Sequence, residues 1–123
     1  MVTNKSKQTL IATHIILATT TYARRIGLLK HDELEPGHAL CIPARKGIPF
    51  MAIHTIGMKF PIDVLFLDKH NQVIRSCTIP PYRIAWVWGV RMVLETAVGT
   101  IEQTRTQEGD AIEFQEKPLP ENQ

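Results

Sequence analysis

Cysteine is scarce in this chain of 123 residues, and the two cysteines present belong to no recognisable motif. Cys41 and Cys77 form no Cys-x-x-Cys pair, which argues against a redox motif, and two thiols are too few for a disulfide framework. The five histidines show no His-x-His pair and no short helical spacing, so we expect no metal site. The sequence therefore predicts two free thiols, no metal and no cofactor.

Long hydrophobic runs are also missing. The apolar stretch in residues 10–17 is interrupted by Thr13 and His14, which makes it too short and too polar for the core of a signal peptide. The other apolar runs are far shorter than the ~20 residues of a membrane-spanning helix. We therefore expect a cytoplasmic protein without a membrane partner.

A strong excess of one charge is absent as well. Fourteen Lys and Arg against twelve Asp and Glu give a net charge of +2. So small an excess argues against a surface that follows a phosphate backbone. We expect no nucleic-acid partner, and both a small-molecule ligand and a homo-oligomer remain open.

The composition is that of one folded domain. The chain is 44% hydrophobic, and a chain of this length buries roughly two thirds of the surface exposed by its unfolded form. The core therefore needs neither disulfides nor a metal ion for its stability. We expect a flexible N-terminus at residues 1–8 and a single domain at residues 9–115. Residues 116–123 contain two prolines and no apolar periodicity, which predicts a flexible tail.

Short segments rich in β-branched and aliphatic residues indicate a mainly β (α+β) protein. We expect six or seven antiparallel strands in a closed or nearly closed structure. The central strand is placed at residues 62–67, because apolar residues occupy both of its alternating faces. Asn71 lies in the following hairpin loop, where a positive φ is expected. The segments predicted as strands are residues 9–17, 39–42, 50–55, 62–67, 73–79, 90–96 and 111–114.

One short helix is predicted at residues 20–29. Tyr22, Ile26 and Leu29 recur with the i, i+4, i+7 spacing of one helical face. Three threonines at residues 19–21 offer hydroxyl groups for an N-cap.

Four blocks along the chain carry a family resemblance through their order and spacing. They are Arg24-Arg25-Ile26-Gly27-Leu28-Leu29, the run His54-Thr55-Ile56-Gly57-Met58-Lys59-Phe60-Pro61-Ile62-Asp63-Val64-Leu65-Phe66-Leu67-Asp68, the turn Pro81-Tyr82-Arg83, and Leu94-Glu95-Thr96-Ala97-Val98-Gly99-Thr100 followed by Gly109-Asp110. Together they resemble a widespread, uncharacterised prokaryotic family called domain of unknown function one-ninety-two. The resemblance covers residues 10–114. It implies a compact, mainly β fold with one short helix, and it implies no reaction.

Asp63 is the polar residue that the pattern of the central strand makes most conspicuous. It shares a face of the predicted strand with Leu65 and Leu67, so its carboxylate lies at the start of a buried face. A carboxylate in that position needs hydrogen-bond donors. One interpretation is structural, with donors from the turn amides of residues 56–58 or from Arg24. The other is functional, with an ionised carboxylate that binds a hydroxyl or amine of a ligand.

The first functional hypothesis is a cleft for a small polar or anionic ligand. His54 and Thr55 precede a bend, from which their side chains can point toward Asp63. The turn that contains Arg83 can supply further donors. We expect His54, Thr55, Asp63 and Arg83 to converge on this cleft, with Arg24 as a further contact.

Two alternatives stay open. Trp86 and Trp88 share one face of an extended segment and could stack on a sugar ring or a base, or pack in a protein-interaction or oligomerisation surface. A hydrolase-like enzyme would use Asp63 or His54 as a general base. The chain has no Gly-x-Ser-x-Gly elbow for a nucleophile, so binding is favoured over catalysis.

Overall fold

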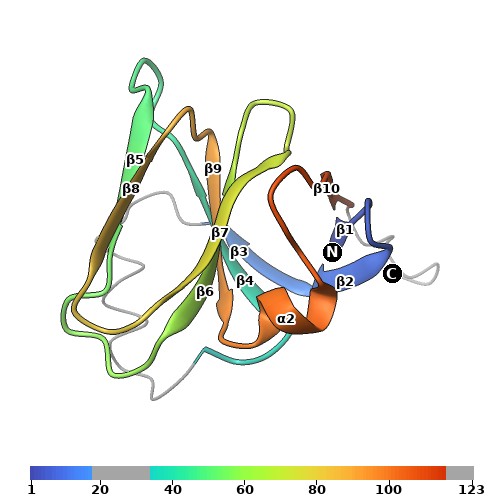
Figure 1. The fold of residues 1–123 in the computed structure, drawn as a ribbon, viewed down its shortest axis with the longest axis horizontal. Coiled ribbons are helices and arrows are strands. Elements are labelled where there is room, and N and C mark those ends of the chain that lie inside the picture. The colour runs from blue at the N-terminus through green and yellow to red at the C-terminus, as the bar shows by residue number, and fades with distance from the viewer. Residues whose placement is uncertain (18–33, 116–123) are drawn as a thin grey trace, which may run out of the picture.

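The computed structural model describes residues 1–17 and 34–115, in which the chain forms ten strands and one short helix. The strands are grouped into a central five-stranded sheet in the order β3-β4-β9-β6-β7, a three-stranded sheet in the order β10-β1-β2 and a two-stranded ribbon of β5 and β8 (Figure 1). Their bounds are β1 (Val2–Asn4), β2 (Thr9–Ala12), β3 (His14–Leu17), β4 (His38–Pro43), β5 (Phe50–His54), β6 (Ile62–Leu67), β7 (Val73–Ile79), β8 (Ile84–Trp88), β9 (Met92–Ala97), β10 (Ile112–Phe114) and the helix α2 (Thr100–Thr104).

The mainly β class is confirmed, with two differences in detail. The strands of the described residues are distributed over three sheets and do not close into a barrel, and they number ten where six or seven were expected. The strand pairs are antiparallel except for β3 and β4, which run parallel.

Strand β6 is an interior strand with both faces buried, but the middle strand of the sheet is β9 and not β6 as predicted. Strand β6 lies between β9 and β7, and all six of its residues are buried. Because successive side chains of a strand point to opposite faces, β6 contributes to two separate cores. This is why its sequence is apolar on both faces.

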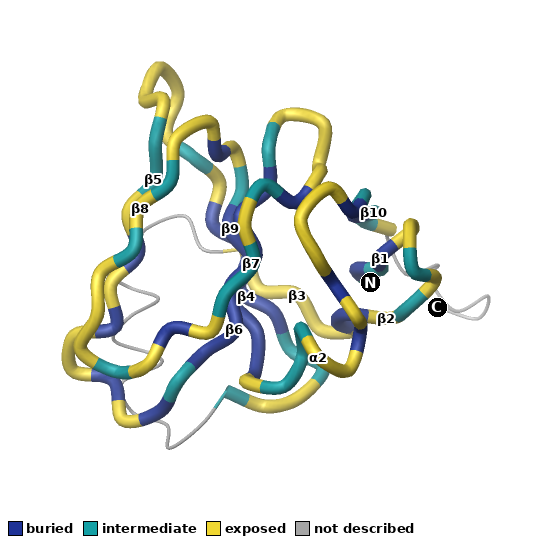
Figure 2. The backbone as a smooth tube through the Cα atoms, viewed as in Figure 1, coloured by how far each residue is buried: buried dark blue, intermediate teal, exposed yellow. Residues whose placement is uncertain are grey.

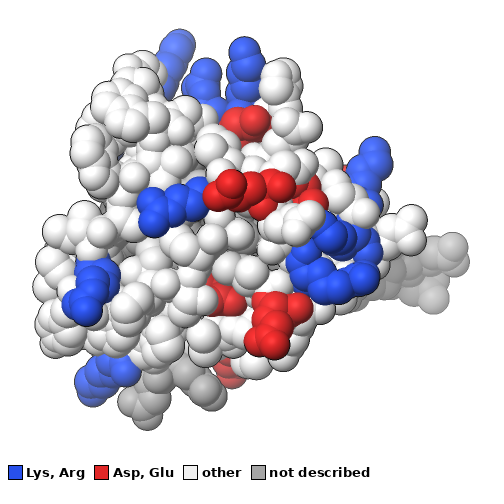
Figure 3. Space-filling model, viewed as in Figure 1, with Lys and Arg blue, Asp and Glu red and all other residues white. Residues whose placement is uncertain are grey.

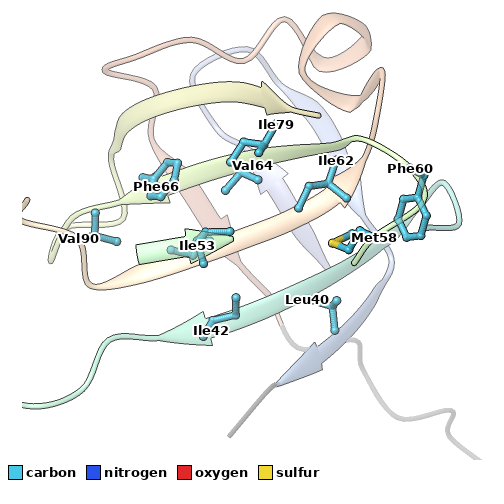
Figure 4. Close-up of a cluster of buried hydrophobic side chains, with 11 residues drawn as sticks. Leu40, Ile42, Ile53, Met58, Phe60, Ile62, Val64, Phe66, Ile79 and Val90 are labelled. Carbon is cyan, nitrogen blue, oxygen red and sulfur yellow. The ribbon is translucent and has the colours of Figure 1, made fainter. Parts of the chain in front are cut away.

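One core, the ribbon-side core, lies between the central sheet and the β5–β8 ribbon (Figure 4). Its buried residues are Leu40, Ile42, Ile53, Met58, Phe60, Ile62, Val64, Phe66, Ile79, Val90 and Val93. The ribbon adds the partly buried Met51, Ala85 and Val87 from its inner face.

The other core, the terminal core, lies on the opposite face of the central sheet and is covered by β1, β2, β10 and α2. Its buried residues are Val2, Ile11, Ala12, Ala39, Cys41, Leu65, Leu67, Val73, Leu94 and Ile112. The tube in Figure 2 shows the burial concentrated along the strands of the central sheet, whereas exposed residues alternate with half-buried ones along β8 of the ribbon.

The N-terminal region differs from expectation. Residues 1–8 were expected to be flexible, but β1 pairs with both β2 and β10, and Val2 and Asn4 are fully buried. The single strand expected at residues 9–17 is divided at Thr13, where the backbone N–H groups of Thr13 and His14 both donate to the carbonyl oxygen of Gly37. The chain thereby passes from one sheet to the next.

The helix of the described residues, α2, was not predicted. The helix expected at residues 20–29 and the tail expected at residues 116–123 lie outside the described residues. Asn71 has the expected positive φ of 58° in the β6–β7 hairpin. Within the described part of the chain, none of the helical structure has the length and apolar character needed to cross a bilayer.

Both cysteines are free, as predicted. Cys41 belongs to the terminal core, whereas Cys77 packs against the ribbon-side core, so the central sheet separates them. Burial raises the pKa of the Cys41 thiol to about 11 and also raises the pKa of Cys77. Both thiols are therefore protonated at neutral pH.

A polar cluster ties the N-terminal strands to the loop before β10. The Asp110 carboxylate accepts hydrogen bonds from Asn4 Nδ2 at 2.9 Å, from Lys7 Nζ at 3.0 and 3.1 Å and from the backbone N–H of Gln107 at 3.0 Å. Burial alone would raise the pKa of Asp110, but these hydrogen bonds and the charge of Lys7 outweigh it, and the pKa is lowered below its ordinary value.

We expect this cluster to make the protein sensitive to acid. A carboxylate whose pKa is lower in the folded state stabilises the fold above its unfolded pKa and loses that contribution as the pH falls through its folded pKa. The window is therefore below pH ~4. Replacing the residue (Asp110→Asn) should lower the free energy of unfolding at pH 7 by about 1–3 kcal/mol and reduce the loss of stability between pH 7 and pH 3.

Urea unfolding at several pH values measures both effects. Glu108→Gln, which changes an exposed carboxylate of the same turn, should leave both quantities nearly unchanged. An Asp110→Asn protein with the parental pH dependence would contradict the prediction.

Candidate functional site

Thr55 is a buried clamp between the end of β5 and the start of β8. Its hydroxyl donates to the carbonyl oxygen of Pro80 at 2.6 Å and accepts from the backbone N–H of Arg83 at 3.0 Å. Its backbone N–H donates to the carbonyl oxygen of Arg83 at 2.9 Å, and its carbonyl oxygen accepts from Tyr82 N. Thr55 is 0% exposed, so the structure gives it a role in holding the turn at residues 80–83 against the bend after β5.

His54 and Arg83 lie beside this clamp, with both residues exposed. His54 is opposite Ile84 in the ribbon, and the Arg83 guanidinium donates to the carbonyl oxygen of Tyr82 at 3.2 Å. The backbone of His54 and Thr55 thus lies next to that of Arg83, while the Thr55 side chain is buried in the turn and the other two residues are exposed.

Asp63 lies elsewhere, at the start of α2. Its Oδ2 accepts from the backbone N–H groups of Gly99 at 3.0 Å and Ile101 at 2.9 Å, and its Oδ1 accepts from the Thr78 hydroxyl at 2.6 Å. The N-cap residue of α2, Gly99, has no side chain that could accept these bonds. Asp63 therefore caps the helix from another strand, where the carboxylate also suits the positive end of the helix dipole.

The expected convergence of the four residues is not found, because the Asp63 side chain lies on the face of the central sheet that points away from the ribbon. Asp63 projects to the face that carries Leu65 and Leu67 of the terminal core, whereas the ribbon packs on the other face of the sheet. Asp63 is 1% exposed and both of its oxygens accept hydrogen bonds, so this geometry does not support a general base. The remaining predicted contact, Arg24, lies outside the described residues.

The outer face of the ribbon carries the two tryptophans. Trp86 and Trp88 form one aromatic cluster with Phe50, with ring centroids 5.2 to 5.8 Å apart. They are 55% and 60% exposed. We call this surface, made of Phe50, Trp86 and Trp88 with the neighbouring Ala52 and Ile84, the aromatic face.

An open cleft of about 520 Å³, the loop cleft, begins at one end of the aromatic face. It is lined by residues 47–49, 68–70 and 88–91, so that Trp88 belongs to both surfaces. Its wall carries Lys69 and Arg91, and the exposed Arg45 and Lys46 immediately precede it in the chain. Lys and Arg side chains gather over these loops at the top of Figure 3.

The sheet topology brings the three lining loops together. Pro43 at the end of β4 and Leu67 at the end of β6 both pair with Met92 at the start of β9. The loops that follow β4 and β6 therefore meet the segment that precedes β9. Hydrogen bonds fix this junction, from Ala44 N to Arg91 O at 2.9 Å, from Arg91 N to Leu67 O at 2.8 Å and from Gly89 N to Pro49 O at 2.7 Å.

Sequence reasoning missed Lys69 and His70 as site residues. The available signal was the basic loop at residues 44–49 and the polar loop at residues 68–72, each following a predicted strand. Without the strand order nothing places these loops side by side. In the part of the chain that the structure describes, no three His, Cys, Asp or Glu side chains are grouped to hold a metal ion.

Comparisons with known proteins agree on the family and the fold. The family model DUF192, described as uncharacterized ACR, matches residues 2–114. A UPF0127 protein of Thermococcus sibiricus is 27% identical over 116 residues, which cover 94% of this chain and 75% of that protein.

Two solved structures share the fold at low sequence identity. A protein of unknown function from Novosphingobium aromaticivorans has a TM-score of 0.72 and 20% identity, covering 92% of this chain and 81% of the other. A putative transcription regulator from Sinorhizobium meliloti has a TM-score of 0.69 and 22% identity, covering 80% and 79% of the respective chains.

We expect Asp63→Ala to act on stability. The substitution removes both acceptor oxygens, which leaves the backbone N–H groups of Gly99 and Ile101 and the Thr78 hydroxyl without this partner. The free energy of unfolding should fall by about 1–3 kcal/mol. Urea unfolding measures it, with Glu102→Gln on the exposed side of α2 as the control. An unchanged unfolding free energy for Asp63→Ala would refute the capping role.

Proposed function

The chain belongs to the DUF192 family, and from this premise we propose that it is a small β domain that binds a small anionic ligand in the loop cleft. The observation that carries the proposal is the meeting of an exposed indole ring, Trp88, with the cationic side chains of Lys69 and Arg91 in one cleft. An aromatic wall with a few charged groups is the usual composition of a small-molecule site.

The size and rigidity of the cleft support this function. Its volume of about 520 Å³ falls within the range of ligand pockets. Its three walls are joined by backbone hydrogen bonds, so the loops that carry the cationic side chains are held in position before a ligand binds.

The charges of the lining residues favour an anion. Lys69 and Arg91 are positive, and Asp68 is the acidic residue of the lining. Asp68 Oδ1 accepts from the backbone N–H groups of His70 at 2.8 Å and Gln72 at 3.0 Å. Asp68 keeps its charge, and with two cations against one carboxylate the charged residues of the lining sum to +1.

This site replaces the cleft expected from the sequence. The ligand class is the one that the sequence suggested, but the residues proposed to bind it are Lys69, Arg91 and Trp88. His54, Thr55 and Arg83 lie at the opposite end of the ribbon.

Pyrophosphate is a suitable probe of the proposed site. Trp86→Phe leaves Trp88 as the sole tryptophan, so that ligand binding in the cleft changes a single fluorescence signal. We expect pyrophosphate to alter this signal and to raise the melting temperature, because a ligand that binds only the folded state stabilises it. Lys69→Ala and Arg91→Ala should each weaken binding about tenfold or more.

Lys5→Ala is the matched control, because it removes an exposed lysine of the turn between β1 and β2, outside the lining of the loop cleft. It should leave pyrophosphate binding unchanged. A neutral sugar such as glucose should not bind. Absence of any pyrophosphate effect at millimolar concentration, or equal weakening by all three alanine variants, would refute the proposed function.

A protein-interaction or oligomerisation surface is the second candidate. The observation that favours it is the exposure of Ile84 and Trp86, at 68% and 55%, outside the loop cleft. Sedimentation velocity of the purified protein would test it. A dimer that dissociates on Ile84→Glu substitution would support this candidate, and a monomer at all concentrations would exclude self-association.

A further inference from the structure

Positive charge is concentrated in the part of the chain that forms the ribbon, its loops and strands β6 and β7. Residues 43–91 contain seven Lys and Arg and two Asp and Glu, a net charge of +5, whereas the whole chain carries +2. Of the two acids, Asp63 is buried on the other side of the central sheet and Asp68 is bound to its own loop. The surface of this half is therefore strongly cationic.

The cations are placed at both ends of the aromatic face. Lys69 and Arg91 line the loop cleft at the Trp88 end, next to Arg45 and Lys46. At the other end, Arg83 immediately precedes β8 and is exposed. Figure 3 shows Lys and Arg but no Asp or Glu over β5 and β8 at the left of the view.

Between these cations, the two indole rings follow one another along a single strand. Trp86 and Trp88 point to the same side of β8, with centroids 5.8 Å apart, and each keeps more than half of its surface exposed. Phe50 on β5 contacts both rings, at 5.6 and 5.2 Å, and so supports them from the neighbouring strand.

We propose that the aromatic face and the loop cleft together bind single-stranded nucleic acid. Successive bases stack on Trp86 and Trp88, and the backbone phosphates contact the cations at the two ends of the face. This combination of exposed aromatic side chains with flanking cations is the one by which proteins bind single strands without reading their sequence. The inference rests on the proposed anion site, which holds a phosphate of the strand.

Charge complementarity separates this partner from a second copy of the chain. A two-fold contact through the aromatic face would bring the same cations of both copies together, which opposes association. A polyanion instead gains from each of them. The whole-chain charge of +2 conceals this preference, because the residues outside 43–91 carry a net charge of −3.

The test is fluorescence anisotropy with a labelled single-stranded oligothymidylate of about ten nucleotides. We expect binding to be tighter than for thymidine monophosphate or for a duplex of the same length. The logarithm of the binding constant should fall with the logarithm of salt concentration with a slope between about −2 and −4, because a few phosphates are neutralised.

Trp86→Ala separates this inference from the proposed function, since Trp86 lies outside the loop cleft. It should weaken oligothymidylate binding at least about fivefold while pyrophosphate binding is retained. Trp86→Leu, which keeps an apolar side chain but removes the ring, should weaken it similarly if the alanine variant is unstable. Leu10→Ala, which removes an exposed apolar side chain on β2, is the matched control and should have no effect.

Each other outcome overturns the inference in a recognisable way. If pyrophosphate binds but oligothymidylate binds no more tightly than thymidine monophosphate, the anion site stands and the nucleic-acid surface does not. If neither binds, both proposals fail. If an oligoglutamate peptide of similar length displaces oligothymidylate and binds more tightly, or if the free protein dimerises through Trp86, the face belongs to a protein partner.

Discussion

The need to cover both faces of the central sheet determines how the rest of the chain is used. All six residues of β6 are buried, and the strand supplies apolar side chains alternately to two cores. Each core therefore needs its own covering layer. The ribbon of β5 and β8 supplies one, and the segments nearest the two ends of the described domain, β1, β2, α2 and β10, supply the other.

Features that depend on neighbouring residues could be predicted from the sequence. The doubly apolar run at residues 62–67 identifies the strand that is buried on both faces, and Asn71 marks the hairpin that follows it. The segments that contain His54, Thr55 and Arg83 also lie side by side, because both flank the ends of paired strands, and the role of these residues as ligand contacts stays a prediction. In each case the decisive interaction is local or lies across one strand pair.

Features that depend on partners far away in the sequence could not be predicted. The helix α2 contains the β-branched Thr100, Ile101 and Thr104, which lower helix propensity, and its cap comes from Asp63 far earlier in the chain. Strand β1 has little apolar pattern of its own and is held by pairing with β10 near the other end of the domain. The loop cleft likewise exists only because the strand order brings Pro43 and Leu67 to the same residue, Met92.

The two covering layers also differ in whether their charged side chains are bound within the fold or exposed to solvent. This difference is the reason that binding is proposed on the ribbon side. In the terminal layer, Asp110 is paired with Lys7, and Asp63, on the same side of the sheet, is satisfied by backbone N–H groups and a hydroxyl, so these charges act within the fold. On the ribbon side, Lys69 and Arg91 line an open cleft, and Trp86 and Trp88 stay exposed although the inner face of the same strand is packed in the core. A two-stranded ribbon needs only its inner face to cover the sheet. Its outer face is therefore free of any structural demand, and aromatic and cationic side chains placed there can serve a ligand without disturbing the core.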